Sequence, residues 1–199
     1  MKIVIGGFLR LFVVVALLMH GSAALAQWEL DGSRSAVNFI SIKNGAVAEI
    51  HSFASLVGYI GRDGQAQLSI NLDSVETLIE VRNERMREML FKTVQFPAAT
   101  VSASVAPDLL AAVVAGGAAN TDLALDLNLH GMEKSMSVPV VLVADAGGDL
   151  QVFTAQPVII NAADFGLAGG ISALQAVAGL DAISTAVPVT VHLVFTRAE

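Results

Sequence analysis

One stretch, residues 73–104, combines a charged helical pattern, a proline and a short strand pattern, inside a chain of mostly β-type segments. Thr77, followed three residues later by Glu80, predicts a capping box at the start of a helix. Pro97 restricts Phe96 to an extended conformation, so the helix must end before it. A chain that is otherwise all-β and holds one such helix has few folds open to it.

The predicted helix has two different faces. Ile79, Met86 and Leu90 fall at helical spacing, which gives an apolar face that can lie on a core. The other face carries Glu76, Glu80, Arg82, Glu84, Arg85, Arg87 and Glu88. Two interpretations of the arginines stay open. Either they pair with the glutamates on a solvated face, or one of them turns inward to a polar head group or a structural partner.

Eight further segments alternate apolar and polar residues and are predicted to be strands. They are residues 35–43, 46–60, 65–72, 99–105, 121–129, 133–144, 149–160 and 185–196. Eight antiparallel strands, each with one buried face, predict closure into a barrel, because closure removes free strand edges. A short second helix is expected over residues 171–181, either as a lid over the barrel mouth or as a plug. No element is predicted for residues 106–120.

Three ordered segments of the chain resemble the YceI-like family. NERMREMLF with FPAATVSAS resembles the family's helix-to-strand signature, LDLNLHGMEKSMSVPVVL its hairpin, and NAADFG a late turn. The chain departs from the usual pattern at Arg34, Met86 and Ala162. The resemblance implies an all-β fold: an eight-stranded antiparallel lipocalin-like β-barrel with one longer α-helix and a short second helix. It also implies an interior that holds a long isoprenoid or acyl chain, and a possible homodimer.

The beginning of the chain has the order of a secretory signal peptide. Lys2 and Arg10 precede an apolar run over residues 11–19, and small residues follow up to Ala26. The apolar run is too short to span a bilayer. We predict that residues 1–26 are cleaved and that residues 27–199 form one barrel domain in the periplasm. The chain has no cysteine, so neither a lipoprotein anchor nor a disulfide is available.

The charge of the chain limits its partners. The formal net charge is −7, and the predicted signal peptide carries two basic residues and no acidic ones, so the mature chain is more acidic still. An acidic surface disfavours nucleic acid and anionic membranes. We therefore expect no nucleic-acid partner and no stable membrane insertion.

Catalytic and metal-binding motifs are missing from the sequence. Glu49 and His51 would share a strand face, but they, His130 and His192 show no spacing typical of a metal site. The prediction is a protein that is not an enzyme and has no cofactor and no metal.

The candidate ligand-binding residues are mostly aromatic. Each phenylalanine could line an apolar tunnel or simply fill the core, while Arg85 matches the helix arginine of the family. The set is Phe39, Phe53, Arg85, Leu90, Phe91, Phe96, Phe153, Phe165, Leu174 and Phe195. The function predicted from these residues is a periplasmic carrier for a polyisoprenoid, an isoprenoid quinone or a fatty acyl compound. The alternative is a ligand-free interaction module with a solid barrel, associated with stress response or a membrane cytochrome.

Overall fold

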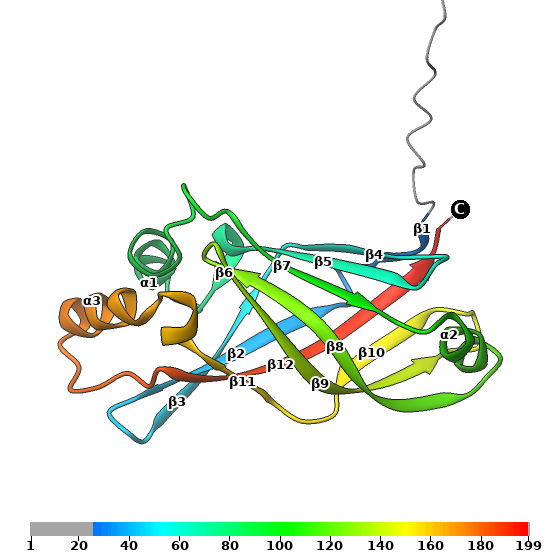
Figure 1. Ribbon diagram of the computed structural model, residues 1–199. Helices are drawn as coiled ribbons and strands as arrows, with labels where there is room; N and C mark the ends of the chain where they lie inside the picture. The colour runs from blue at the N-terminus through cyan, green and yellow to red at the C-terminus, as the bar shows by residue number, and fades with distance from the viewer. Residues whose placement is uncertain (1–25, 199) are drawn as a thin grey trace, which may run out of the picture.

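The computed structural model describes residues 26–198 (Figure 1), and the predicted signal peptide, apart from Ala26, lies outside them. Antiparallel strands dominate this part of the chain. They are β1 (Ala26–Leu30), β2 (Ala36–Lys43), β3 (Val47–Phe53), β4 (Leu56–Gly61), β5 (Gln65–Asn71), β6 (Val75–Glu76), β7 (Ala98–Ser104), β8 (Ala118–Leu129), β9 (Met132–Ala144), β10 (Leu150–Thr154), β11 (Val158–Asn161) and β12 (Ala186–Arg197). The helical elements are η1 (Leu72–Ser74), α1 (Glu80–Arg85), η2 (Met86–Phe91), α2 (Pro107–Val114), η3 (Ala162–Phe165) and α3 (Ala168–Ala178).

Eight of the strands close into a ring. Their order is β1, β4, β5, β7, β8, β9, β10 and β12, and β12 pairs back with β1. β2, β3 and β6 extend this sheet beside β12, while β11 follows β10 along the other edge of β12. The predicted eight-stranded antiparallel barrel is therefore confirmed. Its strands differ from the eight predicted segments: β1 is not among them, residues 35–43 form β2 outside the ring, and residues 46–60 and 149–160 each form two strands separated by a short bend.

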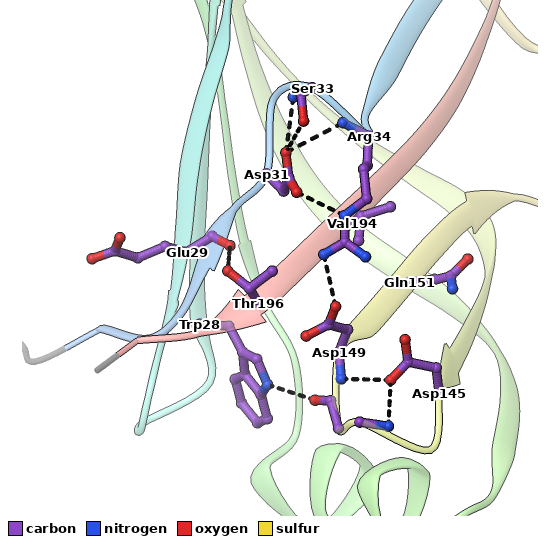
Figure 2. Close-up of polar contacts among 12 residues, drawn as sticks. Trp28, Glu29, Asp31, Ser33, Arg34, Asp145, Asp149, Gln151, Val194 and Thr196 are labelled. Carbon is purple, nitrogen blue, oxygen red and sulfur yellow. Dashed lines mark hydrogen bonds and ion pairs between the residues drawn. The ribbon is translucent and has the colours of Figure 1, made fainter.

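The closure between β1 and β12 is fastened by a small polar cluster (Figure 2). Trp28 of β1 is only 2% exposed, and its indole Nε1 donates a hydrogen bond to the Gly148 carbonyl at 3.4 Å. At the bend after β1, Arg34 donates to Asp31 and to Asp149, both at 2.7 Å. The bend is thereby tied to the turn between β9 and β10.

The Asp31 carboxylate gives this cluster a pH dependence. Hydrogen bonds from the Ser33 hydroxyl and then from Arg34 lower the pKa of Asp31 from its usual 3.8 to about 2. Since the folded pKa is the lower one, the stabilisation is present above the unfolded pKa and is lost as the pH falls through about 2. Asp31→Asn should therefore flatten the fall in the free energy of unfolding between pH 4 and 2, measured by urea denaturation. A slope equal to that of the unsubstituted protein would contradict this.

The start of α1 differs from the prediction. The capping box is wrong: the helix begins at Glu80 after Ile79, and no side chain caps it. Thr77 is buried and its hydroxyl donates to Asn83 Oδ1 at 2.6 Å, while Glu80 accepts from Arg87 instead. The chain between them turns through Leu78 with a positive φ, which moves Thr77 out of capping position. Through η2 the helix continues to Phe91, well before Pro97.

Two helices close the ends of the barrel differently from the prediction. The sequence pattern predicts no helix in residues 106–120, but α2 forms there with Pro107 in its first turn. Leu110 and Val113, three residues apart, turn inward and are 3% and 1% exposed. The other helix, α3, begins three residues earlier than predicted. Gly169 and Gly170, which are predicted to precede the helix, belong to its first turn. Figure 1 shows α1 and α3 at one end of the barrel and α2 at the other.

Candidate functional site

The barrel encloses a cavity of about 270 Å³. Its lining follows the alternation of the strands: on β8, for example, Leu123, Leu125, Leu127 and Leu129 all line it. Six residue steps of about 3.4 Å separate the first and last of these leucines, so the lining extends for about 20 Å along the strand. The interior is thus hollow and elongated, a shape that suits a chain rather than a compact molecule.

The lining is almost entirely hydrocarbon. No charged residue belongs to it, and Gln67 and Thr154 are its only polar residues. The Thr154 hydroxyl oxygen already accepts a hydrogen bond from the Val191 amide at 3.1 Å. A charged guest would lose its hydration without compensation in such a cavity, whereas a buried hydrocarbon gains about 0.8 kcal/mol per CH₂.

The wall at the α1 end is made by helical residues. Leu90 and Phe91 of η2 line the cavity together with Leu167 and with Ile171 of α3. At the opposite end, α2 contacts β8 and β9 and buries Leu110 and Val113 almost completely. Helical elements therefore cover both ends of the barrel.

Helix α3 borders the cavity and packs mainly against η2. Gly166 and Gly179 flank it with positive φ values, no side chain caps its start, and Ile171 is its one fully buried residue. Its Gly170 lies directly on η2: a Cβ there would come within 2.7 Å of the Met89 carbonyl oxygen. A glycine at this position lets the two helices touch, which closes this end of the barrel.

Gly170→Ala should loosen this end of the barrel. The added methyl group would push α3 away from η2, and we expect a loss of about 1–3 kcal/mol in stability together with faster ligand release. Gly169→Ala is the matched control, because a Cβ at Gly169 meets nothing within 4 Å. That control should stabilise the helix by up to about 1 kcal/mol. Chemical denaturation and stopped-flow ligand release measure both effects, and equal behaviour of the two variants would contradict the prediction.

The ten residues predicted as ligand contacts divide into two groups. Five of them line the cavity: Phe39, Phe53, Leu90, Phe91 and Phe195. The other five are not part of its lining. Phe153 stacks on His192 at 4.3 Å, and Phe96 packs on the His130 ring at 4.2 Å. Phe165 is buried in η3, while Leu174 of α3 and Arg85 of α1 are half-buried. Ligand contact by any of the ten stays a prediction.

Most of the residues that line the cavity are aliphatic, and the predicted set of mainly aromatic ligand contacts does not include them. Leu125, Val140 and Val189, on three different strands, are typical members. Their signal was the alternation itself, because each lies on the apolar face of a predicted strand.

A polar cluster of Lys43, Glu49 and Arg82 lies beside the cavity, between the hairpin of β2 and β3 and helix α1. Glu49 forms an ion pair with Lys43 at 2.7 Å and a second with Arg82. The Lys43 hydrogen bond, followed by the charge of Arg82, lowers the pKa of the Glu49 carboxyl. Arg82 also donates to the Thr77 carbonyl at 2.5 Å. Arg82 is therefore an inward-turned arginine with a structural partner.

The two interpretations of the helix arginines thus apply to different residues. Arg87 pairs with Glu80 of the same helical segment at 2.6 Å, as expected for a self-paired face. In the described part of the chain, no group of three or more histidine, cysteine, aspartate or glutamate residues could hold a metal ion.

An aromatic chain connects this polar cluster with the cavity. His51 packs on Phe39 at 5.1 Å, Phe39 on Phe53 at 5.3 Å, and Phe53 on Phe91 at 5.9 Å. His51 is 3% exposed, and its Nε2 is hydrogen-bonded to Ser41 Oγ at 2.8 Å. Burial and then the charge of Arg82 lower the pKa of His51, which favours the neutral imidazole.

Comparison with known proteins agrees with this architecture. The protein-family model of the YceI-like domain matches residues 28–195 of this chain. A solved polyisoprenoid binding domain from Saccharophagus degradans, implicated in plant cell wall breakdown, is 36% identical with a TM-score of 0.84, and the match covers 87% of this chain and 99% of that one. Burkholderia cenocepacia BcnA is 20% identical with a TM-score of 0.65, over 84% of this chain and 99% of that one.

A third solved structure, a mutant YceI protein of Campylobacter jejuni, is 13% identical with a TM-score of 0.52, over 75% of this chain and 84% of that one. The two more distant structures support the fold alone. No match was found among curated proteins. Within residues 26–198, no helix has the length and apolar character needed to cross a membrane. The family match over nearly all of the described residues, together with the 36% identical structure, shows that the chain belongs to the YceI-like family.

Proposed function

We propose that this chain is a periplasmic binding or carrier protein, without catalytic activity, for a long apolar molecule held inside the barrel. The observation that carries the proposal is the elongated cavity without a charged lining residue. The polyisoprenoid-binding description of the Saccharophagus domain supports an isoprenoid lipid or an isoprenoid quinone, with fatty acyl compounds as further candidates. The signal-peptide pattern at the start of the chain supports export.

Hydrocarbon burial supplies enough free energy for such a function. Fifteen buried CH₂ groups would contribute about 12 kcal/mol, at about 0.8 kcal/mol each. Association itself costs on the order of 4–15 kcal/mol. A long tail is therefore needed for useful affinity, and a short apolar molecule would bind weakly. The alternative of a solid interaction module is disfavoured, because it would leave no such cavity.

Native mass spectrometry of the protein expressed with its own N-terminal segment tests the proposal. We expect one adduct per chain that is released by organic solvent and has the properties of an isoprenoid or acyl compound. Delipidated protein should take up one equivalent of an isoprenoid quinone or a long fatty acid. A bare mass after incubation with both would refute the carrier function. The mass of the chain also tests the predicted cleavage, which leaves Gln27 as the first residue.

A further inference from the structure

The inner face of the barrel changes character at the α1 end. Phe39 and Phe53 line the cavity on neighbouring strands. Moving outward along the same face, Phe39 is followed by Ser41, and Phe53 is preceded by His51, because side chains two residues apart share a face. Ser41 is paired in register with Glu49, and Phe39 with His51. The apolar lining thus gives way to polar side chains at this end.

The opposite end shows no such change. There the lining ends in Val105 and Leu142, and α2 covers it with Leu110 and Val113. A guest with one polar end and a long apolar tail would therefore find complementary surroundings in only one orientation, with its tail toward α2.

One ring nitrogen of His51, Nδ1, forms no hydrogen bond with the described residues at the polar end of the barrel. Its Nε2 is engaged by Ser41, whereas its buried Nδ1 has no hydrogen-bond partner in the described part of the chain. A neutral imidazole has one donor and one acceptor nitrogen, so one of these functions is unused whichever tautomer is present. Leaving a buried polar atom unpaired costs free energy, and a ligand atom at this position would remove that cost.

The charges around His51 are too few to neutralise a strongly anionic ligand group. Lys43 and Arg82 share the single carboxylate of Glu49, so the cluster keeps only one uncompensated positive charge. Burial and the nearby Arg82 charge keep His51 itself uncharged. A diphosphate carries two or more negative charges and would lose its hydration without full compensation here, whereas a carbonyl or hydroxyl oxygen needs only the imidazole.

We propose that His51, positioned by Ser41, hydrogen-bonds a neutral carbonyl or hydroxyl head group of the apolar ligand and so fixes its orientation in the barrel. This inference rests on the proposed carrier function. It narrows the ligand to neutral, oxygen-bearing long-chain lipids, such as isoprenoid alcohols or quinones, and excludes their diphosphates as preferred guests.

Three probes with one tail test the inference: geranylgeraniol, geranylgeranyl diphosphate and the corresponding hydrocarbon, each competing with a fluorescent fatty acid. The alcohol should bind about 10-fold more tightly than the hydrocarbon, the ratio expected for one buried hydrogen bond, and more tightly than the diphosphate. His51→Phe keeps an aromatic ring against Phe39 and should bring the ratio of alcohol to hydrocarbon to about 1. His192→Phe, at the histidine stacked on Phe153, should leave the ratio unchanged.

Several outcomes would overturn the inference. One is tighter binding of the diphosphate, and another is an unchanged ratio in His51→Phe, even though uptake itself succeeds. Failure of all three probes to bind would instead refute the carrier function as well. A measurement on the unsubstituted protein avoids any folding defect of the variant. The ¹⁵N chemical shift of His51 Nδ1 should move on addition of the alcohol and stay in place with the hydrocarbon; an equal response to both would also refute the inference.

Discussion

Ala103→Phe is expected to abolish uptake of long apolar ligands while leaving the barrel folded. Ala103 lines the cavity from β7, between Ala66 of β5 and Leu125 of β8. A phenyl ring at this position would extend into the cavity and block the path of the tail. A ligand that loses burial of about four CH₂ groups loses about 3 kcal/mol, which is more than 100-fold in affinity.

The neighbouring residue provides a matched control for this experiment. Ser102 lies on the same strand, but it lines a separate depression together with Gln65 and Ser137. Ser102→Phe adds the same ring outside the barrel and should bind ligand like the unsubstituted protein. Native mass spectrometry gives the bound fraction and circular dichroism the fold. Equal uptake by the two variants would show that the ligand does not occupy the cavity.

Trp28→Ala should cause the largest loss of stability, about 3–5 kcal/mol. The side chain is almost fully buried on β1, the strand that joins β4 to β12 and so closes the ring. Such a loss is a large part of the 5–15 kcal/mol that stabilises a typical domain. Trp28 is the single tryptophan of the chain, so urea denaturation must be followed by far-ultraviolet circular dichroism rather than fluorescence.

Phe153→Ala is the appropriate comparison for Trp28→Ala. Phe153 is half-buried and stacks on His192 outside the cavity lining, so its removal leaves less void and should cost clearly less. If the two variants lost the same free energy of unfolding, the closure of the ring at β1 would contribute no more to stability than an ordinary half-buried contact.

The barrel could be predicted from the sequence because alternation is a local signal. Each predicted strand carries one apolar face, and the leucines of β8 alternate with Ala124, Asp126 and Asn128. Helix α2 escaped prediction because it is only eight residues long, begins at Pro107 and is followed by Gly116 and Gly117, although the spacing of Leu110 and Val113 indicated a buried face. The start of α1 could not be predicted because the Thr77 hydroxyl forms a side-chain hydrogen bond with Asn83 instead of capping the helix. A helix-capping pattern does not reveal this alternative partner.

The candidate site was predictable in kind but only partly in detail. Residue type suggested that Phe153 would belong to it, yet the pairing register places Val152 and Thr154 in the lining instead. The Ser41 hydroxyl engages only the Nε2 of His51, which leaves Nδ1 without a partner among the described residues. This cross-strand contact depends on the register of β2 against β3. Register is set by the whole sheet, so such a site needs a three-dimensional structure.

The pairing of the first strand with the last has a consequence for how this molecule folds. Glu29 and Thr196, which are partners in the ladder, lie 167 residues apart in the chain. The final strand, β12, pairs with β1, β2, β10 and β11, so each of these four strands keeps an unpaired edge until β12 is in place. Contacts between such distant residues make folding slow and leave strand edges open to aggregation meanwhile. A chain shortened before Ala186 should therefore fail to fold, although seven of the eight ring strands would still be present.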